Sequence, residues 1–264
     1  MNHAGAHSLA LGTSNDVTAY SLASGSENIS QGDYTLVNGE KNTSKKKYNT
    51  ISGKSNFNDG NYNLVNGLSN TVNGDNNIVS GSNNVVTSDN SIILGDNIYA
   101  KNANNVIAAG NSINFKDSVE DSIALGKNSK VNGDDAIAIG TSNFVSEESV
   151  TIGHNNETEG PGNVAIGDNN YIGCDNSYTF GNGNRTEGDH TYVEGENNVV
   201  KGDNNYVIGK NQKVTGDNNT VIGNNGTVTA ENAIVIGEFN EPKSNFTNIG
   251  REIQIQTHDT ESNL

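Results

Sequence analysis

The residues that could carry chemistry are few in this sequence and are scattered along it. The five histidines are His3, His7, His154, His190 and His258. None of them has a nucleophile at a spacing that suggests a catalytic pair, which covalent catalysis requires. The sequence therefore predicts no catalytic residue and no enzyme. The single cysteine, Cys174, also excludes an internal disulfide and any metal site built from several cysteines.

One motif rich in oxygen ligands recurs: GDNN, at 74–77, 167–170, 202–205 and 216–219. Asp and Asn oxygens are ligands that Ca²⁺ accepts. Calcium-binding β-rolls, however, repeat G-G-x-G-x-D roughly every nine residues, whereas the Asp positions here are irregular and the repeat is longer. We interpret GDNN as turn chemistry, and we predict neither a metal nor a cofactor.

Composition indicates a thin fold. The chain has 264 residues with 31 Gly, a hydrophobic fraction of only 31% and a net charge of -16. Regular spacing of the apolar residues argues against disorder, which this composition alone would allow. No apolar run approaches the ~18 residues of a membrane span, so membrane insertion is not expected. The acidic charge disfavours nucleic acid as a partner, because it repels phosphates.

Glycine marks a repeat along almost the whole chain. Most intervals between the glycines that close an apolar triplet are 14 residues, from Gly12 to Gly250, and a second Gly often follows seven residues later. Seven residues suit a short strand and a tight turn. The sequence predicts an all-β parallel β-roll, or β-solenoid, of about 18 coils. Positive φ is expected at Asn83, Asn128, Asn155, Asn169 and Asn211, and at the turn glycines, among them Gly81, Gly95, Gly126, Gly140, Gly167, Gly209 and Gly223.

The strand before each glycine is apolar on both faces. Large pairs such as Ile123 and Leu125 flank a small or β-branched residue, and successive strand residues face opposite ways. A thin roll has one interior, so we expect a second copy of the chain to cover the other face. We place the small residues on that face, where they allow close approach of subunits: Ala10, Ala23, Ala108, Ala124, Ala138 and Ala165.

The repeats SIALG (122–126), AIAIG (136–140), SVTIG (149–153), NVAIG (163–167) and NTVIG (219–223) resemble the head repeats of trimeric autotransporter adhesins, the YadA-like adhesins of Gram-negative bacteria. The resemblance covers about Ser8 to Gly250. It implies a left-handed β-roll, a side-by-side homotrimer, and display on the bacterial surface by a stalk and an outer-membrane anchor. The Asn- and Lys-rich style is further similar to a fusobacterial type that binds host CEACAM receptors.

The resemblance also sets the expected organisation. Residues 1–250 are expected to form the head, and 251–264 a tail that leads towards a neck and stalk, so the chain is interpreted as an isolated head. From Leu36 to Gly81 the residue before the glycine is polar, which allows either buried Asn and Ser ladders or a rotated strand: Asn38, Ser52, Asn66 and Ser80.

Three irregular features are candidate binding surfaces for a host cell-surface protein, either a CEACAM-type receptor or a protein of the extracellular matrix. The only intervals of 15 and 16 residues, between Gly95 and Gly126, predict bulges, and unique loops on a rigid scaffold often bind. We nominate Tyr99, Lys101, Phe115 and Lys116 there. A basic patch, Lys45, Lys46, Lys47 and Tyr48, is the second choice. The column Tyr178, Tyr192 and Tyr206, with Phe180, is expected to fill a wide part of the roll or the trimer axis.

Two alternatives to an adhesin head are retained. A ligand-free spacer or self-association module would need the same solenoid and no binding surface. An ice-binding solenoid would need a flat ranked array of Thr, and here the threonines are dispersed: Thr50, Thr71, Thr220, Thr227 and Thr247.

Overall fold

The structure is a computed structural model that describes residues 1–238, 246–249 and 253–256. It contains strands and turns and, in these residues, no helix. The chain divides into two compact units, residues 1–141 and 142–264. The last ladder glycine, Gly250, and most of the tail predicted at 251–264 lie outside the described residues.

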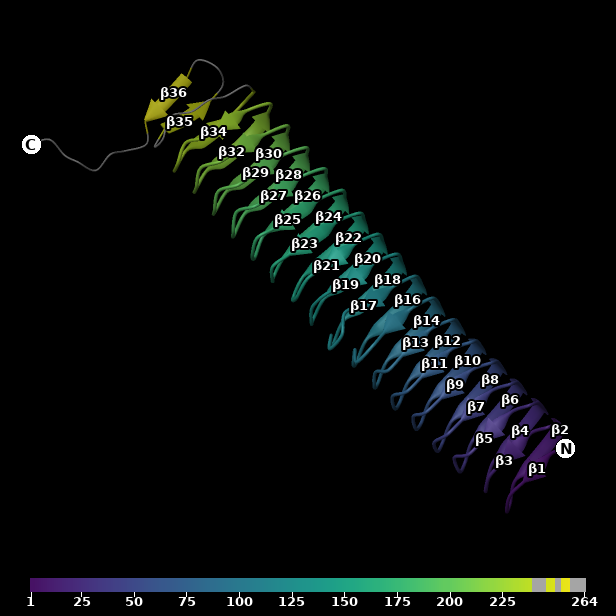
Figure 1. Ribbon diagram of the computed structural model, residues 1–264. Helices are drawn as coiled ribbons and strands as arrows, with labels where there is room; N and C mark the ends of the chain where they lie inside the picture. Colours follow the sequence, from purple (N-terminus) through teal and green to yellow (C-terminus); the bar gives the residue numbers. More distant parts are fainter. Residues whose placement is uncertain (239–245, 250–252, 257–264) are drawn as a thin grey trace, which may run out of the picture. The chain divides into compact units, whose positions relative to one another are not determined.

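Each unit is a parallel β-solenoid in which every coil has one long and one short strand (Figure 1). In the first unit the long strands are β2 (Leu9–Thr13), β4 (Leu22–Ser26), β6 (Leu36–Glu40), β8 (Thr50–Lys54), β10 (Leu64–Leu68), β12 (Ile78–Ser82), β14 (Ile92–Asp96), β16 (Ile107–Asn111), β18 (Ile123–Lys127) and β20 (Ile137–Thr141). The short strands are β1 (His3–Ala4), β3 (Asp16–Val17), β5 (Ile29–Ser30), β7 (Thr43–Ser44), β9 (Phe57–Asn58), β11 (Thr71–Val72), β13 (Val85–Val86), β15 (Tyr99–Ala100), β17 (Asn114–Phe115) and β19 (Lys130–Val131).

The second unit repeats this plan. Its long strands are β22 (Val150–His154), β24 (Val164–Asp168), β26 (Tyr178–Asn182), β28 (Tyr192–Glu196), β30 (Tyr206–Lys210), β32 (Thr220–Asn224) and β34 (Ile234–Ile236). Its short strands are β21 (Phe144–Val145), β23 (Glu157–Glu159), β25 (Tyr171–Gly173), β27 (Arg185–Thr186), β29 (Val199–Val200), β31 (Lys213–Val214) and β33 (Thr227–Val228). After β34, the strand β35 (Phe246–Ile249) pairs with it in parallel, and β36 (Ile253–Gln256) pairs antiparallel to β35.

Neighbouring long strands pair in register, one coil apart. In β10 and β12, for example, Leu64 lies opposite Ile78 and Gly67 opposite Gly81. The glycines predicted to make turns have the positive φ expected of them, with Gly81 at 131° and Gly95 at 136°. Their placement in turns is wrong, because each is the fourth residue of a long strand, as Gly81 is in β12. A Cβ on Gly81 would lie 1.8 Å from the carbonyl oxygen of Gly95, so no other residue fits there. The all-β solenoid with a period of about 14 residues is therefore confirmed.

Each strand contributes one residue to the core. The second residue of every long strand after β2 and the second of most short strands are buried, as in Val65 with Val72 and Val79 with Val86. Interior space between the two sheets is narrow, so each strand contributes mainly Val, Ala or Ile. This explains how a chain with so few hydrophobic residues still folds around a continuous core.

Asparagine forms a second, polar part of the core. Most coils bury an Asn at one corner, although Ile98 and Ile113 take that place in two coils of the first unit. Asn70, for example, donates from Nδ2 to Oδ1 of Asn56 at 3.0 Å and to the carbonyl oxygen of Gly81 at 2.9 Å. Its own Oδ1 accepts from the backbone and the side chain of Asn84, at 3.1 and 3.0 Å. Each side chain thus satisfies corner backbone groups that would otherwise be buried without partners. The second unit has the same ladder in Asn156, Asn170, Asn184, Asn198 and Gln212.

Replacing Asn70 by Ala should lower the free energy of unfolding by about 2–4 kcal/mol, because several buried partners lose their hydrogen bonds at once. The matched control is Asn83→Ala. That residue is exposed and has the positive φ of 57° predicted for it, so the expected loss is about 1 kcal/mol from backbone strain alone. Urea unfolding followed by circular dichroism measures both values. Equal losses would show that the ladder adds nothing beyond the turn.

Candidate functional site

An exposed apolar surface runs along the long-strand sheet of each unit. We call it the apolar face, and define it by the first and third residues of the long strands. In the first unit the first position is almost always Leu or Ile, and Leu9 and Leu64 are 51% and 45% exposed. In the second unit Ile222, Ile234 and Ile236 are similarly exposed. A contiguous apolar surface of this kind usually marks an interaction site.

The predicted strand faces are wrong. Ala23, Ala108, Ala124, Ala138 and Ala165, which we expected to pack against another subunit, have no exposed surface and line the interior of the roll. Ala10 occupies the same position in the first coil, where it is half-buried. The physical reason is the narrow interior, which accepts one small or medium residue from each strand but not the large flanking pair. That pair faces outward and forms the apolar face.

The polar stretch of the first unit does not change this geometry. Asn38 and Asn66 are exposed, and Ser52 and Ser80 are half-buried, all at the third position of their strands. Asn38 accepts a hydrogen bond from the hydroxyl of Ser24 at 2.7 Å. The strands are neither rotated nor do they bury these side chains, so both alternatives considered for this stretch are wrong. Here the apolar face is one column of aliphatic residues beside one polar column.

Aromatic residues replace the aliphatic ones in part of the second unit. Tyr178 and Tyr206 are exposed and Tyr192 is half-buried at the first strand position. The rings of Tyr192 and Tyr206 stack with centroids 4.9 Å apart, and Phe180 packs against Tyr192 at 5.5 Å. The expectation that these rings fill the roll is therefore wrong. Placement at a trimer axis stays a prediction.

A second aromatic column, which the sequence analysis missed, follows a corner of the first unit. We call it the tyrosine ladder: His7, Tyr20, Tyr34, Tyr48 and Tyr62. Successive centroids are 5.1, 5.3, 5.2 and 4.8 Å apart, and every ring is stacked on the next. All five residues have φ between 55° and 59°, a region that bulky side chains rarely adopt. Stacking of about 0.5–1.5 kcal/mol per pair offsets that strain.

The tyrosine ladder is confined to these coils. Later coils of the same unit place Asn76, Asn90, Asn105, Asp121 and Asp135 at this corner, which are the residues that tolerate positive φ best. A shallow groove of about 510 Å³ separates His7 and Tyr20 from Leu9, Leu22 and Leu36 of the apolar face. The sequence signal that could have revealed the ladder was a Tyr or His, in place of Asn, at the same corner of consecutive coils.

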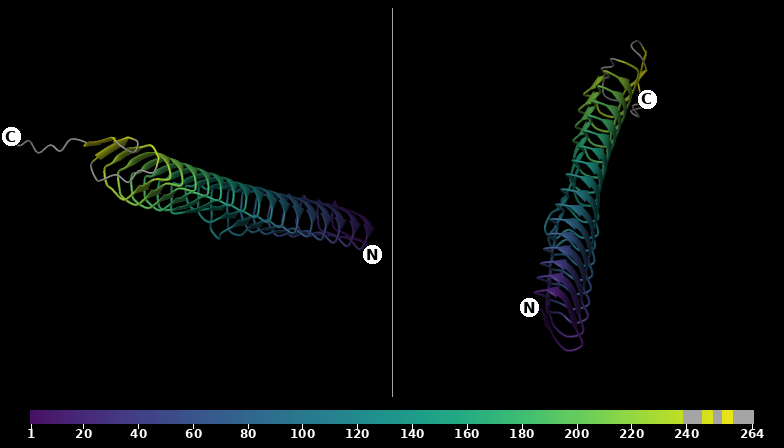
Figure 2. Two further views of the ribbon diagram at one scale, coloured as in Figure 1. Left: turned by 90° about the horizontal axis from the view of Figure 1, so that it is seen from above. Right: turned by 90° about the vertical axis from the view of Figure 1, so that its right-hand side faces the viewer.

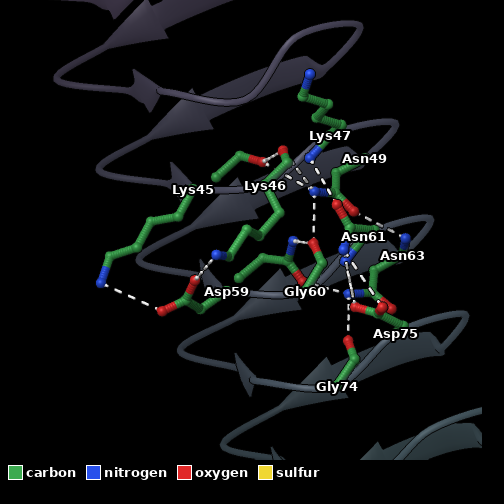
Figure 3. Close-up of polar contacts among 12 residues, drawn as sticks. Lys45, Lys46, Lys47, Asn49, Asp59, Gly60, Asn61, Asn63, Gly74 and Asp75 are labelled. Atoms are coloured by element: carbon green, nitrogen blue, oxygen red, sulfur yellow. Dashed lines mark hydrogen bonds and ion pairs between the residues drawn. The ribbon is translucent and has the colours of Figure 1, made fainter.

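The predicted basic patch is exposed but largely neutralised (Figure 3). Lys45 and Lys46 both approach Asp59, at 3.4 and 3.9 Å, and Lys47 lies 3.1 Å from Asp33. A hydrogen bond from Lys47 to Asp33 raises the pKa of the lysine, so its charge persists. The Lys45 ammonium also lies over the ring of Phe57, 4.7 Å from its centroid. Exposed pairs of this kind contribute little stability, and three cations share two carboxylates.

The off-register segment is a widened corner rather than a free loop. Its extra residues follow β15 and β17 and widen the ribbon there (Figure 2). In these added residues Asn104 bridges Glu120, and Ala103 and Val119 are buried. Tyr99 and Lys116 are exposed, and Lys101 pairs with Asp117 at 3.0 Å. Phe115, however, is only 1% exposed and lies in the core. Its nomination as a receptor-binding residue is wrong, because the second residue of a short strand points inward.

The part of the chain that the structure describes contains no cluster suited to a metal ion. No three His, Cys, Asp or Glu side chains within that part are grouped closely enough to hold an ion. Cys174 is buried, and desolvation raises the pKa of its thiol to about 11, which makes it a poor nucleophile. Those same residues include no helix that could cross a bilayer.

Two protein families match this repeat. The model of the grass antifreeze beta roll matches residues 4–95 and 147–241, and that of the YadA head domain repeat matches two copies within 120–143. The first match extends over more than half of the sequence, so the chain belongs to the grass antifreeze beta-roll family. The second is short, and it supports similarity to a YadA-like head without fixing the type of adhesin. No curated protein matches the chain.

Proposed function

We propose that this chain is a non-enzymatic, YadA-like adhesin head, displayed on a bacterial surface, that assembles as a homotrimer through the apolar face. The observation that carries the proposal is the aliphatic column exposed on the long-strand sheet, at Leu64, Ile78, Ile92 and Ile107 in the first unit. A monomer would leave this surface in water, at a cost of about 25 cal/mol per Å² relative to its burial. The two YadA head repeats at 120–143 add independent support.

The proposed ligand is a host cell-surface protein, of the CEACAM type or of the extracellular matrix, and we place its contact on the tyrosine ladder. Tyr34, Tyr48 and Tyr62 are 52%, 47% and 60% exposed and are held rigidly by stacking. Binding hot spots favour Tyr, and ordered rings lose little entropy when they bind. Three copies would present three ladders, so weak contacts would add through effective concentration.

The test replaces Tyr34, Tyr48 and Tyr62 by Asn, the residue that the same corner carries in later coils. Because Asn suits the positive φ, the variant should keep the fold, while attachment of protein-coated beads to receptor-bearing cells should fall at least about tenfold. The comparison variant Tyr99→Ala, Lys101→Ala, Lys116→Ala examines the widened corner and should attach normally. Attachment that depends on neither set would place the contact elsewhere on the chain, whereas wild-type beads that attach no better than uncoated beads would favour the ligand-free spacer.

Ice binding is the second candidate function, because the grass antifreeze beta-roll model matches residues 4–95 and 147–241. A parallel sheet with strands about 4.8 Å apart can present a regular surface to a lattice. The outward columns are nevertheless mixed: Asn38, Leu94 and Glu194 share the third strand position. Thermal hysteresis of the purified chain distinguishes the two functions, since an adhesin head should show none.

A further inference from the structure

An aromatic slot interrupts the short-strand sheet of the second unit. A cavity of about 280 Å³ opens between Phe144 and Tyr171, bordered by Ser142, Asn155, Glu157 and Asn169. Phe144, Glu157 and Tyr171 occupy the same outward position in consecutive coils, in paired register. The backbone positions that carry the two rings are therefore two strand spacings apart, about 10 Å. Glu157 lies between them in register and lines the same cavity.

The Tyr171 wall of the slot is held in place by three contacts. Its hydroxyl donates to Glu159 at 2.8 Å, and this hydrogen bond raises the pKa of Tyr171, so the donor stays protonated. The ring lies over Gly173, where an added Cβ would come within 2.5 Å of the hydroxyl oxygen. Arg185 lies over one ring face, 4.3 Å from the centroid. The ring is thus positioned before any ligand arrives.

The slot carries the negative charge of the Glu157 carboxylate. Glu157 is exposed, and within residues 1–238 no ion pair involves its carboxylate. A cation centred between the rings would be about 5 Å from each, inside the range of roughly 6 Å over which a ring attracts a cation. Asn155 and Asn169, linked by a hydrogen bond of 3.0 Å, supply amide groups at the rim.

The chain shows the matching recognition mode one coil further on. The guanidinium of Arg185 stacks on Tyr171 and is paired with Glu187. A guanidinium that enters the slot would contact the other face of the Tyr171 ring and the carboxylate of Glu157. This repeats the combination of ring and carboxylate that Arg185 contacts. We propose that the slot between Phe144 and Tyr171 binds the arginine side chain of a partner polypeptide, with Glu157 pairing its guanidinium. This site lies on the short-strand sheet and does not depend on assembly through the apolar face.

The experiment titrates blocked arginine, Nα-acetyl-arginine methylamide, into protein carrying ¹³C-labelled Phe and Tyr rings at low salt. We expect saturable shifts of Phe144 and Tyr171, with Kd in the millimolar range typical of one cation–π contact plus one exposed ion pair. Blocked citrulline, the neutral isostere, should produce no saturable shift. Glu157→Gln should raise Kd at least about fivefold, and Tyr171→Phe should leave it within about twofold because the ring remains.

Glu147→Gln is the matched control, since it removes the same charge from an exposed residue of the same unit outside the slot. It should leave Kd unchanged. Equal weakening by Glu147→Gln and Glu157→Gln would mean non-specific attraction and would overturn the proposal. Citrulline binding as well as arginine would overturn it too, as would tighter binding of blocked lysine or of choline. Tyr171→Ala should abolish binding, as followed by the chemical shifts of the Phe144 ring. If this variant still bound arginine, the slot would not be the binding site.

Discussion

Ala124→Arg should destabilise the first unit by at least about 3 kcal/mol, because it places a charge inside the roll without a partner. Ala124 has no exposed surface and pairs with Ala108 and Ala138 in the neighbouring coils. The interior accepts one modest side chain from each strand, so an Arg can neither fit nor reach water. In a solenoid each coil is stabilised only by contact with its neighbours. Unfolding should therefore begin at the coil of Ala124 and extend to the adjacent coils.

The measurement is urea unfolding by circular dichroism, with hydrogen exchange to locate the opened coils. Ile123→Arg is the control one residue earlier on β18, where the side chain faces outward and is half-buried. It should keep the β spectrum of the wild type, and any loss of exchange protection should be confined to amides that assembly through the apolar face would cover. If Ala124→Arg were tolerated and Ile123→Arg unfolded the unit, the assignment of strand faces made from the structure would be inverted.

The coil could be predicted from glycine and asparagine spacing because their backbone requirements are local. Gly81 and Asn83 adopt the positive φ that their residue types favour. The strand faces could not be predicted in the same way. A strand with Ile123, Ala124 and Leu125 is apolar on both sides, so period-two patterning does not say which side is inside. The width of the interior decides, and it depends on contacts between sheets.

Phe115 shows where register could have improved the prediction. It follows Gly110 by five residues, and the residue at that offset is also buried in other coils, as Val86 after Gly81 and Val131 after Gly126. Large aromatic residues beside a Lys suggested a binding site, but position in the coil was the stronger signal. By the same register Tyr99, four residues after Gly95, faces outward.

The side-chain ladders were hidden for a different reason. Asn70 and Asn83 are the same residue type, yet one closes a buried hydrogen-bond ladder and the other only makes a turn. Tyr48 seemed part of a basic patch, although its main contacts are the rings of Tyr34 and Tyr62. Stacking along the solenoid relates residues 14 positions apart, and motif reading within one segment does not detect such columns.

The double substitution Ile107→Arg, Ile123→Arg should abolish association of the chain while leaving each copy folded. Both residues occupy the first position of adjacent long strands, β16 and β18, and lie opposite each other on the apolar face. In a trimer assembled through this face, six guanidinium groups would be brought together in a poorly hydrated interface. Desolvation and like-charge repulsion would each cost several kcal/mol there, which exceeds what neighbouring aliphatic contacts can offset.

Light scattering gives the result directly, with a trimer expected for the wild type and a monomer for the double variant. The matched control, Val85→Arg, Asn114→Arg, adds the same charge to outward positions of the short-strand sheet and should remain trimeric. A wild-type chain that is a monodisperse monomer would contradict the proposed assembly, since the apolar face would then be stable in water. If the double variant were still a trimer, the interface would not lie on the apolar face. If the control pair lost association in that case, the interface would lie on the short-strand sheet.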